Sequence, residues 1–185
     1  TRRDLDLATL EPRNRSVQAL LGIKATNETQ VLKQPDVLML LSMLQDEFDE
    51  ETIRTNWNYY TPRTDLTHGS SLAPGIQAIL ASRMGDLDLA YHLYMQAALV
   101  DLKDLRLNTE HGIHGATAGG VWQAVVFGFG GLRLTDQGIT AAPPDVLRID
   151  EKNRQEYAIP NVCGVIITTN HKSDGIFLPA DDRRH

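Results

Sequence analysis

The pattern of apolar and polar positions predicts helices over most of the first 144 residues. From Pro35 onward, apolar side chains recur three and four positions apart, which is the spacing of one helix face. These positions are Val37, Leu40, Leu41, Leu44 and Phe48. Pro35 suits the first turn of such a helix, because that turn does not need the missing N–H. A second helix is expected over residues 50–60, ended by Pro62.

Three further helices are expected between residues 74 and 128. The first opens at Pro74 and ends at Gly85, and Asp86 is a suitable N-cap for the second. The third spans about residues 116–128. The positions expected to face the core are Ile76, Ile79, Leu80 and Met84, then Leu87, Ala90, Tyr94 and Ala98, then Val121, Trp122, Val125 and Phe129. Short and long connections alternate, as in stacked helical hairpins.

The pattern changes after residue 144. Pro143 and Pro144 interrupt the chain, and residues 145–157 are charged without a clear period. Residues 162–169 then form an unbroken run of apolar and β-branched side chains, which is typical of a buried strand. The sequence therefore predicts a mainly α chain with a short β-containing C-terminal tail, divided between residues 144 and 145.

Composition and charge limit the classes of protein to which the chain can belong. The chain has 185 residues, of which 42% are hydrophobic and 23% charged, as in an ordinary globular protein. Its net charge of -6 does not favour a nucleic-acid partner. No apolar run approaches the roughly 18 residues of a membrane helix, and the first residues do not form a signal peptide. A single cysteine, Cys163, excludes an internal disulfide and a cysteine zinc cluster, so we expect a cytoplasmic protein.

Two polar segments are candidates for chemistry. The segment THGSSLAPG, residues 67–75, places Ser70 and Ser71 just before a helix, where free N–H groups bind anions; alternatively, Ser71 only caps the helix. The segment NTEHGIHGATAGG, residues 108–120, carries Glu110, His111 and His114. Histidine binds oxyanions or moves protons near neutral pH, but no third ligand stands at a metal-site spacing. The alternative is that these histidines only form hydrogen bonds with the backbone.

Two further sets of residues are weaker candidates for binding, and each has an alternative, non-functional explanation. Lys33 and Gln34 precede a helix, where they either reach into a pocket or face solvent. Four aromatic residues either stack on a sugar ring or belong to the core: Trp57, Tyr59, Tyr60 and Trp122.

Three long motifs give the sequence a family resemblance. They are VLKQPDVLMLL, HGSSLAPGIQAILASRMGDLDLAYHLYMQAALVDL and NTEHGIHGATAGGVWQAVVFGFGGLRL. Over about residues 1–144 the chain resembles the C-terminal part of the catalytic domain of glycoside hydrolase family 65. That family includes phosphorylases of maltose, kojibiose and trehalose and some α,α-trehalases. The resemblance implies part of an (α/α)6 barrel made of paired helices.

The resemblance also implies roles for individual residues. Lys33 and Gln34 match the pair that holds the glucosyl unit, and the phosphate-binding positions are matched by His68, Ser70, Ser71 and His114. Glu110 and His111 are further possible members of the site. Inorganic phosphate is then a co-substrate and a small sugar the partner, with no metal or other cofactor.

The same resemblance implies that the chain lacks half of its catalytic pair. In the phosphorylases, phosphate attacks the anomeric carbon while a glutamic acid protonates the leaving oxygen. The family's general acid lies upstream of any residue here, and Glu110 does not replace it. We therefore expect no catalytic residue and no activity from this chain alone. Phosphorolysis and hydrolysis remain alternatives, partly because position 111 is histidine where many members carry an acidic residue.

The tail resembles a different class of protein. Residues 145–185 are similar to phage-type primase–helicase proteins with a superfamily 3 helicase ATPase domain. That resemblance implies that Asn170 is a nucleotide sensor and that Arg183 or Arg184 is an arginine finger. No phosphate-binding G-x-x-x-x-G-K-[ST] loop is present in the sequence. Three hypotheses follow: part of an α-glucoside-cleaving enzyme, a nucleotide-binding module, or a non-functional chimera.

Overall fold

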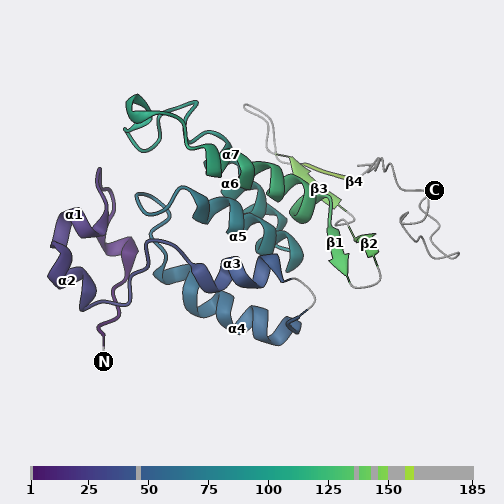
Figure 1. Cartoon of the computed structure of the whole chain (residues 1–185), viewed down its shortest axis with the longest axis horizontal. Coiled ribbons are helices and arrows are strands. Elements are labelled where there is room, and N and C mark those ends of the chain that lie inside the picture. The colour runs from purple at the N-terminus through teal and green to yellow at the C-terminus, as the bar shows by residue number, and fades with distance from the viewer. Residues whose placement is uncertain (1, 45–46, 136–137, 143–145, 150–156, 161–185) are drawn as a thin grey trace, which may run out of the picture.

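The computed structural model describes residues 2–44, 47–135, 138–142, 146–149 and 157–160, and it is built mainly from helices (Figure 1). Seven α-helices are described, together with shorter 3-10 and π-helical segments labelled η. The elements are η1 Leu7–Leu10, α1 Val17–Leu21, α2 Ile23–Asn27, α3 Asp36–Met43, α4 Glu50–Tyr60, η2 Thr61–Arg63, α5 Leu72–Arg83, α6 Leu87–Ala98, η3 Thr109–His111, α7 Gly115–Gln123, the π-helix η4 Ala124–Phe129, β1 Leu132–Thr135, β2 Gly138–Ala141, β3 Val146–Ile149 and β4 Tyr157–Pro160.

Helix α5 is the centre of the helical body. It packs against α3, α6, α7 and η4, and Figure 1 shows it between α3 and α6. Every residue from Ala73 to Ser82 is buried, so α5 has no polar face. This is the pattern of a helix enclosed by neighbours on all sides. The buried side chains around it form two clusters, which share the partly buried Trp57.

Helix boundaries follow the predictions where local signals are strong. Helix α4 has the predicted bounds, and the Asp49 carboxylate caps it by accepting a hydrogen bond from the Thr52 N–H at 2.7 Å. Asp86 caps α6 as predicted, with the Leu89 N–H donating at 3.1 Å. Helix α5 begins two residues before Pro74, and Ser71 occupies its N-cap position.

The predicted inward face of α3 is confirmed only in part: Leu41 is buried, and Val37 and Phe48 pack against the core. The helix ends at Met43, so Leu44 and Phe48 do not continue it. Leu40 and Leu44 are exposed, whereas Leu38 and Leu41 are buried. Nearly every position of this helix is apolar, so spacing alone cannot identify the inward face. The contact with α5 determines which side is buried.

The predicted inward face of the last helix is also confirmed only in part, since Phe129 packs against the core but Trp122 and Val125 do not face it. Trp122 is 60% exposed and Val125 is exposed as well. The buried face consists of small residues: Thr117, Gly120, Ala124 and Gly128. A Cβ atom on Gly75 would lie 3.3 Å from the Gly120 backbone, so α5 and α7 approach too closely for larger side chains. From Ala124 onward the helix is a π-helix rather than the predicted α-helix.

Two β-hairpins follow the helices. Strand β1 pairs antiparallel with β2, although the sequence predicted no strand before residue 144. Strand β3 pairs antiparallel with β4 within the charged segment that showed no period, and β3 lies against α6. The predicted strand over 162–169 lies outside the described residues. A mainly α chain of helical hairpins with β-structure towards its C-terminal end is confirmed.

Candidate functional site

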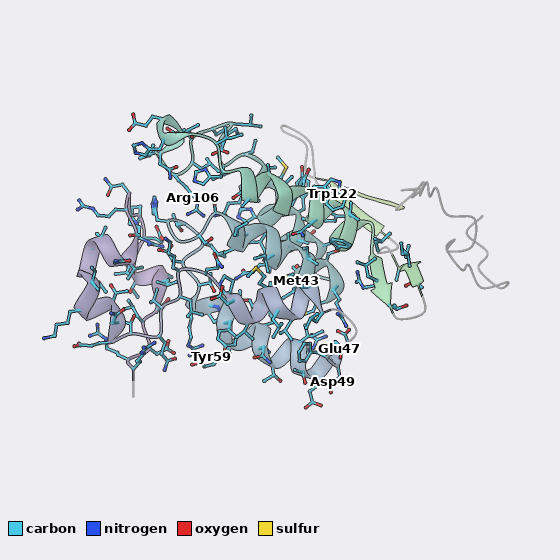
Figure 2. The ribbon with its side chains drawn as sticks, in the orientation of Figure 1. Met43, Glu47, Asp49, Tyr59, Arg106 and Trp122 are labelled. Carbon is cyan, nitrogen blue, oxygen red and sulfur yellow. The ribbon has the colours of Figure 1, made fainter. Side chains whose placement is uncertain are left out.

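A polar pocket of about 500 Å³ lies where the N-terminal ends of α5 and α7 meet the segment before and within α1. Figure 2 shows Arg106 in this region, between the N-terminal helices and the loop that precedes α7. The pocket is lined by Asn14, Arg15, Ser16, Ala19, Lys33, His68, Gly69, Ser70, Ser71, Arg106, Asn108 and His114. Five of the residues that the sequence singled out therefore line one pocket: Lys33, His68, Ser70, Ser71 and His114.

A tight turn before α5 positions the two serines. The Gly69 N–H donates to the Asp65 carbonyl at 2.9 Å, and the Ser70 N–H donates to the Lys33 carbonyl at 2.8 Å. A Cβ atom on Gly69 would lie 2.1 Å from the Asp65 carbonyl oxygen, so only glycine fits. The Ser70 hydroxyl donates to Gln34 Oε1 at 2.9 Å. Gln34 therefore fixes Ser70 from behind the pocket.

Ser71 connects the ends of two helices. The Thr117 hydroxyl, in the first turns of α7, donates to Ser71 Oγ at 2.7 Å. The Ser71 hydroxyl proton is then left for a ligand, since one hydroxyl both accepts and donates. Ser71 is the N-cap residue of α5 and His114 that of α7. The positive ends of two helices thus lie at one space, which favours an anion.

A carboxylate orients His114. The Asp101 carboxylate accepts hydrogen bonds from the His114 backbone N–H at 2.7 Å and from Nδ1 of its ring at 2.5 Å. These bonds lower the pKa of Asp101, so it is ionised at neutral pH. Nδ1 is then the donor nitrogen, and Nε2 accepts a hydrogen bond from Asn108 Nδ2 at 3.4 Å. Asp101 and Asn108 thus fix the orientation of the His114 ring where it lines the pocket.

A buried ion pair supports the opposite wall. Arg13 donates both terminal nitrogens to the Asp65 carboxylate at 2.7 and 2.5 Å, and both side chains are 3% exposed. Burial raises the pKa of Asp65, but the hydrogen bonds and charge of Arg13 and the His68 N–H outweigh burial and lower it. His68 lies between these groups, since its Nε2 is 3.0 Å from the Arg13 carbonyl oxygen. The pair joins the N-terminal segment to the turn.

The charges that line the pocket are all positive. Arg15, Lys33 and Arg106 contribute cations, and none of the described residues that line the pocket carries a carboxylate. The pKa of Arg106 is lowered by burial, and the charge of Asp65 acts against that effect. An arginine remains protonated despite such a shift. The pocket is therefore built for an anion.

The structure places some of the predicted residues elsewhere. Glu110 and His111 lie on the surface, with side chains 81% and 78% exposed, and they pair only with each other at 3.8 Å. Neither lines the pocket. Asn170, Arg183 and Arg184 lie outside the described residues, so their roles stay predictions.

Several pocket residues were not predicted. Asn14, Arg15 and Ser16 come from a polar segment without periodicity, and Arg106 comes from a loop with no motif of its own. Asn108 begins the NTEHGIH segment, and that position was the only signal that could have found it. Across the described ranges, no three His, Cys, Asp or Glu side chains are grouped closely enough to hold a metal ion.

A second, smaller hollow lies towards the other end of α5. Its volume is about 210 Å³, and it is lined by Ser42, Met43, Ile79, Gln123, Phe127 and Leu134. These side chains are mostly apolar and include no charged group. Within the described part of the chain, no helix is both long and apolar enough to cross a membrane.

The chain is similar in sequence to known phosphorylases. The chain is 49% identical to a kojibiose phosphorylase of Thermoanaerobacter brockii over 118 residues, 64% of this chain and 15% of that protein. It is 42% identical to an alpha,alpha-trehalose phosphorylase of Geobacillus stearothermophilus over 114 residues, 62% of this chain and 15% of that protein. The chain therefore spans about one seventh of the length of these curated relatives.

A solved structure has a similar fold. It is described as "Putative kojibiose phosphorylase from human microbiome", and it matches with a TM-score of 0.71 and 30% identity over 86% of this chain and 23% of that chain. The family model for the glycosyl hydrolase family 65 central catalytic domain matches residues 2–123, which include every residue that lines the polar pocket. The chain belongs to glycosyl hydrolase family 65.

Proposed function

We propose that this chain supplies the phosphate-binding side of an enzyme that cleaves an α-glucosidic disaccharide by phosphorolysis. The observation that carries the proposal is the polar pocket, in which hydroxyls, a carboxylate-oriented histidine, cations and two helix N-termini surround one space. Phosphate matches this set of donors in charge and in the number of its acceptor oxygens. The relatives named as kojibiose and trehalose phosphorylases support the same reaction class.

The pocket favours phosphorolysis over hydrolysis. A hydrolase activates a neutral water molecule with a carboxylate base, whereas the lining of this pocket is cationic and carries no carboxylate. His111, the unusual feature of the sequence, lies on the surface and does not alter the pocket. In the proposed reaction, a phosphate oxygen attacks the anomeric carbon as the glycosidic C–O bond breaks. Lys33 and Gln34 are the candidates for holding the glucosyl unit.

We further propose that the chain does not turn over disaccharide by itself. Breaking the glycosidic bond requires a general acid that protonates the leaving oxygen, and no glutamate or aspartate lines the pocket. Asp101 and Asp65 are near, but each is engaged in hydrogen bonds that lower its pKa. Neither is suited to donate a proton at neutral pH.

The direct test is a calorimetric titration of the purified chain with inorganic phosphate. Chloride and sulfate serve as comparison anions. Saturable phosphate binding that is weakened at least tenfold by Ser71→Ala supports the proposal. Phosphate binding no tighter than chloride binding contradicts it. In parallel, incubation with phosphate and kojibiose, trehalose or maltose is expected to release no glucose 1-phosphate. Robust turnover would contradict the proposed inactivity.

The division of the chain between residues 144 and 145 stays a prediction. We propose to test it with long reads of source DNA across the codons for Pro144 and Asp145. Reads that cross the junction on single molecules would show a genuine fusion. Reads that diverge there would assign residues 145–185 to another gene.

A further inference from the structure

We propose that Arg106 is a positioning residue for the anion-binding turn, residues 66–70. Its guanidinium holds carbonyl oxygens of this turn, which fixes the turn beside the Ser71 hydroxyl and keeps those carbonyls from facing the anion. This inference rests on the proposed function, because it concerns the same pocket. No motif or predicted role in the sequence includes Arg106.

The contacts of Arg106 are confined to this turn. Nη1 donates to the Gly69 carbonyl at 2.7 Å, and Nη2 donates to the carbonyls of Leu66 and Ser70, both at 3.2 Å. Thus one side chain holds three of the five carbonyl oxygens between residues 66 and 70. The planar guanidinium can do this because its donors diverge from one plane.

Arg106 has no carboxylate partner among the described residues. The nearest candidate, the buried Asp65 carboxylate, is occupied by both terminal nitrogens of Arg13. A half-buried guanidinium that contacts only carbonyls keeps its full charge in the pocket wall. That charge is available to an anion, and it does not need to be released from an ion pair first.

The carbonyls that Arg106 holds would otherwise oppose anion binding. The Gly69 and Ser70 carbonyl oxygens belong to the same turn as the Ser70 and Ser71 hydroxyls. An unpaired carbonyl oxygen near phosphate adds repulsion and a desolvation cost. Arg106 pairs the Gly69 oxygen, and it adds a charged donor to the Ser70 oxygen, which also accepts from the Ala73 N–H at 3.2 Å. The positive guanidinium thus offsets the negative ends of both carbonyls next to the space that an anion would occupy.

The geometry requires arginine and not merely a positive charge. Lysine at this position retains the charge but is a point donor at the end of a flexible stem, so it cannot bridge three carbonyls at fixed positions. Arg106→Lys therefore separates positioning from charge. Gln96→Met is a matched control, because Gln96 Nε2 also donates to the Leu66 carbonyl, at 2.8 Å, but carries no charge and does not reach Gly69 or Ser70.

The first experiment needs no ligand. Amide hydrogen exchange of the Gly69 and Ser70 N–H groups is measured by NMR in the whole chain, with α6 amides as an internal reference. We expect exchange at these two amides to be at least tenfold faster in Arg106→Lys and nearly unchanged in Gln96→Met. Unchanged exchange in Arg106→Lys would overturn the positioning role, whether or not the protein binds phosphate.

The second experiment measures affinity for inorganic phosphate in the same variants. We expect Arg106→Lys to weaken binding at least fivefold and Gln96→Met less than twofold. Full phosphate affinity in Arg106→Lys, with wild-type protein binding phosphate, would overturn the link between the turn and the anion. If the wild-type chain does not bind phosphate, the proposed function fails, while faster exchange in Arg106→Lys would still support the positioning of the turn.

Discussion

The two ends of α5 carry opposite kinds of surface. At its N-terminal end the polar pocket gathers hydroxyls, histidines and cations from five separate segments of the chain. Towards its C-terminal end the smaller hollow is lined mainly by apolar side chains, including Ile79, Phe127 and Leu134. The same buried helix supports both. The difference indicates that the polar pocket, and not the hollow, suits an anion, because the positive ends of two helices lie there.

The two regions also differ in how their side chains are held. In the pocket, Ser70, Ser71 and His114 each have at least one side-chain hydrogen bond to another segment or to Asp101. In the hollow, Met43 and Leu134 are exposed apolar side chains. Hydrogen bonds specify direction, whereas apolar contacts specify mainly area. The pocket is therefore expected to respond sharply to substitution and the hollow only weakly.

The largest effect is expected for Asp65→Asn, which breaks the buried pair behind the pocket. Arg13 would keep only Glu11, a partly exposed carboxylate 2.8 Å from its Nε, so the loss should approach the roughly 3–5 kcal/mol that removal of one partner of a buried pair costs. Urea unfolding at pH 7 measures the loss. As a control, Glu50→Gln removes the partner of Arg83 in an exposed pair and should cost less than about 1 kcal/mol. Equal losses of unfolding free energy in both variants would contradict the prediction that the buried pair contributes more to stability than the exposed pair.

The same pair predicts how stability depends on pH. The pKa of Asp65 is lower in the folded chain than its ordinary value of about 3.9. Its stabilising contribution is therefore fully present above about pH 4–5, and it is lost as pH falls through the lowered pKa. The difference in unfolding free energy between wild type and Asp65→Asn should shrink in that acid range. A difference that grows on acidification would contradict this assignment.

An intermediate effect is expected for Ser71→Ala in the pocket. The variant removes the hydroxyl that Thr117 holds in place at the joined ends of α5 and α7. Phosphate affinity should fall about tenfold, or about 1.4 kcal/mol, since hydrogen bonds to charged groups contribute about 1.5–3 kcal/mol. Calorimetry measures the affinity, and Thr117→Val, which keeps the serine, should cost less. A larger loss in Thr117→Val would contradict direct contact of Ser71 with phosphate.

A smaller effect is expected for Asp101→Asn. The Asp101 carboxylate holds both the ring and the backbone N–H of His114 at the N-cap of α7. The asparagine variant keeps the shape of the side chain but loses the charge-assisted hydrogen bonds, so phosphate affinity should fall several-fold. Phosphate titration by calorimetry tests this. Unchanged affinity would contradict the role of Asp101 in orienting His114.

The smallest effect is expected in the hollow. Leu134→Ser changes an exposed side chain, so the unfolding free energy should change by less than about 0.5 kcal/mol, and phosphate affinity should stay the same. Thermal unfolding and a phosphate titration check both quantities. A change in phosphate affinity would show that the two ends of α5 are coupled. It would contradict the conclusion that the pocket and the hollow act separately.

The fold could be predicted where local signals decide it. The bounds of α4 follow from its spacing and from Pro62, and the start of α6 follows from the Asp86 cap. The buried face of α7 could not be predicted, because it is set by the close approach of Gly75 to Gly120, 45 positions away. Trp122 is apolar and well spaced, yet it is exposed because small residues fill that contact instead.

The site residues also differ in whether a local signal in the sequence could identify them. Ser70, Ser71 and His114 stand in recognisable segments next to helix starts, so sequence reasoning reached them. Arg106 contacts carbonyls 36 to 40 positions away, and Arg15 enters from a segment without periodicity. Such contacts depend on how segments pack, and no local spacing encodes them. Glu110 and His111 show that a local signal can also mislead. Their side chains are chemically suited to a site and stand in a recognisable segment, yet they are exposed to solvent.

The central claim is that the chain binds phosphate at the N-terminal end of α5 and not elsewhere on this helix. The most direct test is an NMR titration of the whole chain with inorganic phosphate at constant ionic strength, following backbone amides residue by residue. The account predicts saturable shifts at Gly69, Ser70 and Ser71 and in the first turn of α7, with none at Ile79 or Gln123. Shifts centred on the hollow, or no saturable shift at the turn, would contradict it.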